Sequence, residues 1–389
     1  MPLALRGYLV ANINLCWIIG QIIALGTLRG FLDDGSEWSY RYIQQSFDRF
    51  RGGTDDCCRI PFAIQWAFAL VVFIASYLAP ESPWWLVRQR KFDEARKVLV
   101  RLGNKTRRFN PDNVLAMMQH TDTVEKQLNN GKAERNDVSY LECFRGTNLR
   151  RTEIACVLFM AQNMCGLPLT GFAAYAFQRI GFSSNLAFNL TLGMHGLAVV
   201  ACLLALGLIT RFGRRRIILW GLTACFFTLL TAAALASVPE STPTLWAQAS
   251  MSILFIFVFN LSMGPLTYSV VAEVPSTRLK VHTVVLARIA YNINALVTNI
   301  IQSHALNPLS WNLRGKTNYI WAFTCLCCLV YAFARVPETR GLTYHELDIL
   351  FEKKAGARKF GSIQKRLEET GYFGFYERQS DASLDAAWT

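Results

Sequence analysis

Long apolar stretches separated by short polar ones are the main feature of the chain. A helix needs about 20 apolar residues to cross a bilayer core of about 30 Å, and in lipid the backbone N–H groups must be satisfied within the helix. The pattern therefore predicts an all-α, polytopic membrane helix bundle with eight spanning helices. The predicted spans are Tyr8–Leu28, Ile60–Ala79, Ile154–Gln178, Leu186–Thr210, Ile217–Val238, Leu245–Val271, Val281–Gln302 and Asn318–Ala334.

Composition and charge support a multi-pass membrane protein. Of the 389 residues 52% are hydrophobic and 17% charged, whereas soluble domains carry about 25% charged residues. The net charge is +13, and most of the 40 lysines and arginines lie in segments that an even number of spans places on one side. The positive-inside rule makes that side cytosolic. No basic stripe interleaved with aromatics is present outside the spans, so we expect membrane lipid and not nucleic acid as a partner.

The sequence shows no signature of an enzyme or a metal protein. Most of the eleven cysteines lie within apolar stretches, where cysteine usually serves as a small packing residue. No CxxC pairs with a second CxxC or with histidine, and no phosphate-binding glycine loop or nucleophile–base pair appears. We therefore expect no metal, no cofactor and no catalytic residue.

Polar residues inside the spans are the functional candidates. An amide offers both a donor and an acceptor, and an aromatic ring can cover the C–H face of a sugar, so this set suits a neutral polyhydroxylated ligand. The alternative is that the amides join helices by interhelical hydrogen bonds. We expect a packing or hydrogen-bonded role for His195, and a snorkelling position for Arg288. The other candidates are Asn12, Asn14, Gln21, Gln162, Asn163, Asn189, Asn260, Tyr268, Asn292, Asn294 and Asn299.

Glycine and proline predict breaks in two of the spans. Pro265, in Gly264-Pro265, removes one helical hydrogen bond and bends its helix. Gly166, Pro168 and Gly171 weaken another span in the same way. Interrupted helices near the membrane midplane suit an alternating-access carrier, although they also occur as plain kinks.

Four charged motifs lie at the ends of spans: PESPWWL from Pro80, RFGRR from Arg211, PETRG from Pro337, and Gly264-Pro265 followed by Glu273 and Arg278. In this order they resemble the sugar porter family of the major facilitator superfamily. Within it the chain is most similar to fungal general α-glucoside (maltose-type) permeases, from Met1 to about Glu352. The resemblance implies sugar:proton symport by alternating access, at the plasma membrane.

The resemblance also implies a charge network that closes the cytosolic side in the outward-facing state. Its members here would be Glu81, Arg214, Arg215, Glu273, Arg278, Glu338 and Arg340. The alternative is that these are loop charges that hold the topology.

The family's sugar-binding positions fall on Asn14, Gln162, Asn163, Tyr268 and Asn292. Asn14 is shorter than the family's glutamine, Tyr268 replaces a tryptophan, and Pro168 replaces an asparagine. These differences favour a substrate other than plain glucose, and a disaccharide such as maltose fits the subgroup.

The motif order makes the first span correspond to the fifth of twelve family helices. We therefore expect residues 1–80 to be the remnant of an N-terminal half, 81–153 to be cytosolic linker helices, 154–335 to be a C-terminal six-helix half, and 336–389 to be a cytosolic tail. Without the first four helices, and with a late start codon at Met1, we expect poor transport. The polar insert Tyr42–Arg59 suggests a retained intron, or else a genuine outer loop. A sugar sensor of the same fold, which binds without transport, is the alternative function.

Overall fold

The computed structural model describes residues 3–30, 59–103, 110–128, 140–239, 241–276 and 279–340, and a few positions between 342 and 360. Every element in these ranges is helical, which confirms the predicted all-α class. The polar insert falls outside them apart from Arg59, as do the last 29 residues. The chain separates into two compact units, residues 1–50 with 139–366 and residues 51–138 with 367–389.

The predicted spans coincide with helices. The unbroken ones are α1 (Leu3–Gly30), α3 (Arg59–Leu78), α10 (Ser184–Arg211), α11 (Arg214–Leu235), α14 (Lys280–Leu306) and α15 (Asn318–Arg335). Within the described residues, six helical stretches are long and apolar enough to cross a membrane, and residues 12–27 and 68–78 form shorter apolar helices.

The other two spans are interrupted where glycine and proline occur. One divides into α7 (Gly146–Met164), α8 (Pro168–Gly171) and α9 (Ala173–Ile180). Gly166 adopts a φ of 101° at the first break, a conformation that side chains with a Cβ rarely tolerate. The second divides into α12 (Thr242–Leu261) and α13 (Met263–Glu273), because Pro265 cannot donate to the carbonyl of Leu261.

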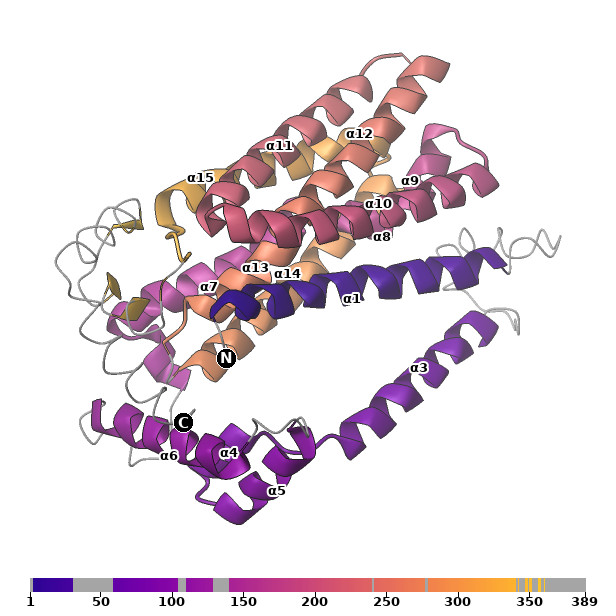
Figure 1. Cartoon of the computed structure of the whole chain (residues 1–389). Coiled ribbons are helices and arrows are strands. Elements are labelled where there is room, and N and C mark those ends of the chain that lie inside the picture. The colour runs from indigo at the N-terminus through magenta and orange to yellow at the C-terminus, as the bar shows by residue number, and fades with distance from the viewer. Residues whose placement is uncertain are drawn as a thin grey trace. The chain divides into compact units, whose positions relative to one another are not determined.

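The first unit is a bundle in which segments distant in sequence lie side by side (Figure 1). Helix α11 packs against α15 and α12, and α14 packs against α7. Helix α1 runs along α10 and α13. Small residues such as Ala198, Ala201 and Ala205 on α10 are fully buried, as close helix–helix approach requires.

The second unit contains α3 and helices from the predicted linker region. Helices α4 (Pro83–Arg88), α5 (Phe92–Leu102) and α6 (Pro111–Leu128) pack around a small apolar core. Its buried members are Leu86, Val87, Ala95, Leu99 and Met118. On the surface the Nε atom of Arg96 donates to Asp112 over 2.6 Å, and this bond lowers the pKa of the Asp112 carboxyl.

Candidate functional site

A polar cavity lies within the first unit, where α1 meets the breaks of α7–α8 and α12–α13. The space between its atoms, including the opening, is about 460 Å³. Its lining residues are Asn14, Trp17, Ile18, Gln21, Gln162, Leu167, Thr170, His195, Ala198, Ile256, Phe259, Asn260, Tyr268 and Tyr291.

Two asparagines form a buried pair on one wall. The Nδ2 atom of Asn14 donates to Oδ1 of Asn260 over 3.1 Å, and Nδ2 of Asn260 donates to the carbonyl of Ile256 over 3.0 Å. Helix α13 can approach α1 this closely because residue 264 is glycine, since a Cβ there would lie 2.8 Å from Nδ2 of Asn14. Asn14 therefore joins two helices and also lines the cavity.

Gln162 occupies a place created by the break between α12 and α13. Its side chain is 3% exposed, and Nε2 donates to the carbonyls of Gly264 over 3.1 Å and Met263 over 3.4 Å. Both carbonyls belong to the first turn of α13, directly after the break. The remaining Oε1 atom of Gln162 is an acceptor on the cavity wall.

Aromatic rings cover another side. Tyr268 and Tyr291 both line the cavity, and each packs edge-to-face with Phe159, at centroid distances of 5.4 and 6.0 Å. The guanidinium of Arg288 lies 4.3 Å from the ring centroid of Tyr291 and 5.8 Å from that of Trp17. This cation is thus held by aromatic faces next to the cavity.

Three of the five predicted binding residues line the cavity: Asn14, Gln162 and Tyr268. Asn163 and Asn292 do not belong to the lining. Asn163 is buried and donates through Nδ2 to the carbonyl of Tyr291 over 3.3 Å, and Asn292 is exposed on α14. The adjacent Tyr291 lines the cavity instead.

The lining also contains residues that the resemblance did not select. Asn260, His195 and Gln21 were only among the polar candidates within spans, and that polarity was their signal. Thr170, Trp17 and Tyr291 are common residue types in apolar helices, and nothing in their local sequence distinguishes them.

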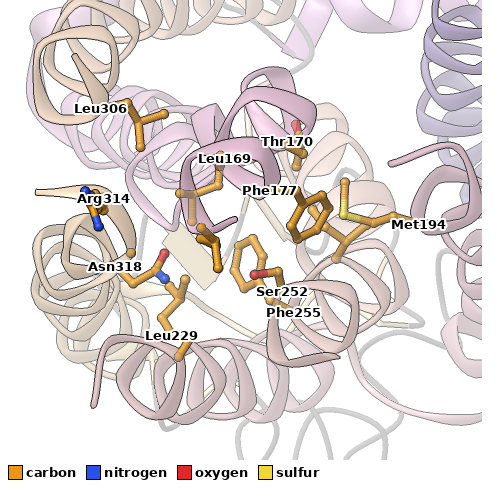
Figure 2. A pocket seen from close by; sticks show the side chains of 16 residues that line it. Leu169, Thr170, Phe177, Met194, Leu229, Ser252, Phe255, Leu306, Arg314 and Asn318 are labelled. Atoms are coloured by element: carbon orange, nitrogen blue, oxygen red, sulfur yellow. The ribbon is translucent and has the colours of Figure 1, made fainter. Parts of the chain in front are cut away.

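A second cavity of about 600 Å³ adjoins the first, since Thr170 and Ile256 line both. Figure 2 shows its apolar lining, which includes Leu169, Phe177 and Phe255, with Arg314 and Asn318 on one side. Because this wall is mostly apolar, it offers few hydrogen-bond partners for the hydroxyl groups of a sugar. The first cavity is therefore the candidate binding site.

The charged motifs meet at one end of the bundle, which we call the motif end: Arg211, Gly213, Arg214, Glu273, Glu338, Thr339 and Arg340. Oε1 of Glu338 accepts from the backbone N–H of Arg214 over 2.8 Å and from that of Arg340 over 3.2 Å. This carboxylate therefore caps the first turn of α11, where a negative charge is favourable.

A buried ion pair lies beside this cap. Nη2 of Arg214 is 3.4 Å from Oε1 of Glu273, with side-chain exposures of 11% and 7%. Thr339 Oγ1 donates to the other Glu273 oxygen over 2.6 Å, and Arg340 Nη1 donates to the carbonyl of Arg211 over 2.6 Å. The ends of α10, α11 and α13 are thus tied to the segment after α15.

The remaining network members are placed differently. Arg215 donates to the carbonyls of Phe333 over 2.8 Å and Ala357 over 3.1 Å. Glu81 belongs to the second unit and is exposed, and Arg278 lies outside the described residues. Four of the seven predicted members, namely Arg214, Glu273, Glu338 and Arg340, meet at the motif end.

Among the described residues no three His, Cys, Asp or Glu side chains gather in a way that could hold a metal ion.

Comparisons with known proteins agree with this architecture. The profile of the sugar (and other) transporter family matches residues 1–351. The general alpha-glucoside permease of Saccharomyces cerevisiae is 34% identical over 362 residues, covering 93% of this chain and 56% of the permease. The yeast maltose permease MAL31 is 30% identical over 367 residues, covering 93% of this chain and 56% of the permease. The chain thus spans little more than half the length of these curated relatives.

Solved structures with the same fold include the xylose transporter XylE. Its complex with 6-bromo-6-deoxy-D-glucose, described as a major facilitator superfamily proton:xylose symporter, superposes with a TM-score of 0.67 at 18% identity. The match covers 90% of this chain and 68% of XylE. The inward-open form from E. coli gives a TM-score of 0.60. At this identity the likeness concerns the fold alone, and it confirms the predicted major facilitator architecture.

The family match and the helical fold confirm the resemblance on which the sequence interpretation depended, including the expectation of a transporter class instead of an enzyme. With 351 of its residues covered by the profile, this multi-pass membrane chain belongs to the sugar (and other) transporter family.

Proposed function

We propose that the polar cavity binds a neutral sugar of the α-glucoside class, such as maltose. The observation that carries the proposal is the composition of the lining: buried amides, tyrosines and a histidine, with no carboxylate among the described lining residues. Neutral hydroxyl groups match such a wall, whereas a cationic ligand would lose hydration without gaining an ion pair. The names of the yeast relatives, which are α-glucoside and maltose permeases, support the ligand class.

We further propose that the helices of this chain serve sugar:proton symport at the plasma membrane by alternating access, with the low uptake that the sequence analysis expects. Support comes from the interrupted helices beside the cavity and from the symporter that shares the fold. In this proposal the motif end is part of a latch. A network of this kind can bias two states that differ by a few kcal/mol, even where single exposed pairs contribute less than about 1 kcal/mol.

The test of ligand class is direct binding of radiolabelled maltose to the full 389-residue chain in lipid nanodiscs. Unlabelled maltose should compete, and glucose 6-phosphate should not, because the lining offers no site built for a phosphate. Gln162→Ala should weaken binding about tenfold or more, since it removes an acceptor on the cavity wall and the two hydrogen bonds that hold α7 to the start of α13. Gln178→Ala is the matched control, because Gln178 lies on α9 outside both cavity linings.

The same preparation, sealed in proteoliposomes, separates the candidate functions. Binding accompanied by uptake that a proton gradient drives would support the symporter. Binding without uptake is also expected of a chain that transports poorly, so the sensor requires ligand-induced signalling in addition. Equal binding by wild type and Gln162→Ala would contradict the assignment of the site.

A further inference from the structure

His195 lies at the cavity wall with one ring nitrogen already engaged. The residue is 3% exposed, and it lines the cavity from α10. Its Nδ1 atom is 2.8 Å from the carbonyl oxygen of Thr191, one turn earlier in the helix. A carbonyl can only accept, so Nδ1 carries the hydrogen.

This bond determines what the ring presents to the cavity. A neutral imidazole protonated on Nδ1 has a lone pair on Nε2, and Nε2 is then an acceptor only. No carboxylate in the described lining favours the doubly protonated ring. Thr191 is itself fixed, since its Oγ1 atom donates to the carbonyl of Ala187 over 2.8 Å and its side chain is fully buried.

The buried side chains around the cavity share this acceptor character. Gln162 directs its N–H groups at backbone carbonyls, and Asn260 directs its own at Ile256. Because those partners are carbonyls, the orientation of each amide is fixed, and Asn14 must then donate to Oδ1 of Asn260. Thr170 donates to the carbonyl of Leu167 over 2.8 Å.

The buried amides, Thr170 and His195 therefore offer mainly acceptors to the cavity, while the hydroxyl of Tyr291 can both donate and accept. The oxygens of Gln162, Asn14 and Thr170 and the Nε2 atom of His195 all require a ligand that donates. Sugar hydroxyls do so readily. A ligand group of similar size that can only accept, such as a fluorine or a methyl ether, leaves these atoms unsatisfied.

We propose that His195 is a specificity-determining residue whose Nε2 atom accepts a hydrogen bond from one hydroxyl group of the bound sugar. The inference rests on the proposed function and makes it more specific, because it adds α10 to the binding site and assigns the ligand the role of donor there. His195 acts on ligand selection and carries no proton in this account.

The test compares maltose with a set of monodeoxyfluoro-maltoses, each with one hydroxyl replaced by fluorine. Binding is measured on the full chain in nanodiscs, for wild type, His195→Asn and His195→Gln. Asparagine places an amide where Nδ1 lies, so it can keep the bond to Thr191 while removing the group at the Nε2 position. Glutamine places an amide at the Nε2 position instead.

We expect one analogue to bind wild type about tenfold or more weaker than maltose does. His195→Asn should weaken maltose binding about tenfold and abolish the difference in affinity between maltose and that analogue. His195→Gln should restore a large part of the maltose affinity and of the discrimination against that analogue. A purely structural role would lower the thermal midpoint in His195→Asn and leave the discrimination between ligands unchanged.

Two further outcomes separate this inference from the proposed function. If wild type binds maltose but His195→Asn binds every analogue as wild type does, the inference is wrong and the proposed function stands. If wild type binds no neutral glycoside, both fail. Nitrogen-15 NMR of the five histidines, with His195 assigned through its loss in His195→Asn, tests the tautomer without ligand. A proton on Nε2 would overturn the proposal.

Discussion

Gly213 and Glu338 show how closely a single residue can set the geometry of the motif end. The backbone of Gly213 has ordinary angles, so its requirement is one of space. A Cβ at this position would lie 2.1 Å from Oε2 of Glu338, the carboxylate that caps α11. Any side chain here displaces the cap.

We therefore expect Gly213→Ala to reduce the free energy of unfolding by about 1–3 kcal/mol. The measurement is the thermal midpoint in detergent, followed with a thiol-reactive dye that reports exposure of the buried cysteines. Gly207→Ala is the control, because its Cβ would meet nothing within 4 Å near the end of α10. A midpoint for Gly213→Ala at or above that of the control would contradict the close contact.

The buried pair of Arg214 and Glu273 leads to a second prediction. Glu273→Ala leaves the Arg214 guanidinium buried without its carboxylate and removes the acceptor of Thr339. Removing one partner of a buried pair typically costs about 3–5 kcal/mol. Glu273→Gln should be milder, because its amide oxygen can still accept. Equal midpoints for wild type and Glu273→Ala would show that the pair does not hold the motif end together.

At the residue scale the sequence predicted the kind of side chain in the site better than its exact membership. Asn292 and Tyr291 are neighbours, but one residue turns a helix by about 100°. The looser alignment at this helix therefore selected the neighbour of the residue that lines this cavity. Asn163 is directed to a backbone carbonyl of α14, and that partner is determined only by tertiary packing.

At the scale of elements, the breaks of α7 and α12 are the features that shape the cavity. Gly166 combines a φ of 101° with close neighbours, since a Cβ would lie 3.2 Å from the ring of Phe255. Gly181 ends α9 with a φ of 123°, but a Cβ there would meet only Leu245, at 3.6 Å. The two glycines share the conformation and differ in the space around them.

Gly166→Ala should thus be more destabilising than Gly181→Ala. In both variants the alanine must adopt a left-handed backbone, which costs about 1–2 kcal/mol. Only Gly166→Ala also displaces core side chains. Thermal midpoints of the two variants, measured side by side, provide the comparison. A larger loss in Gly181→Ala would mean that the break at Gly166 is less tightly packed than described.

The linker helices depend on a small core, so single core truncations should matter. Leu99 belongs to the apolar core of α4, α5 and α6 and is 6% exposed, whereas its neighbour Val100 is 54% exposed. Leu99→Ala should destabilise the second unit by about 2–5 kcal/mol, and Val100→Ala by much less. Hydrogen exchange of peptides from α5 in the full chain measures this loss of stability. Equal protection in the two variants would contradict the predicted core.

Helix positions were predictable because the bilayer requires long apolar stretches and a fully bonded backbone. Proline also identified a break correctly, although the helix ends at Leu261 and not at Pro265. The reason is that a proline removes the bond to the carbonyl four residues earlier. The carbonyls that Gln162 bonds beside this break depend on how α7 packs against α13.

At the scale of the whole molecule, the motifs identified the family because each is a set of residues needed where helices leave the membrane. Glu338 caps α11, and Glu273 pairs with Arg214, so charges far apart in the sequence meet at one end. From the sequence, the proximity of these charges was expected only because of the family resemblance. The cavity between the broken helices required the three-dimensional arrangement, because its lining comes from seven helices.

The most direct test of the central claim is a cryo-electron microscopy structure of the full chain in a nanodisc with saturating maltose. We predict density for the disaccharide between Gln162, Asn14 and Tyr268, with a hydroxyl group within hydrogen-bonding distance of Gln162 Oε1. Density in the apolar cavity around Phe177 and Phe255 instead, or an empty polar cavity at saturation, would contradict the account.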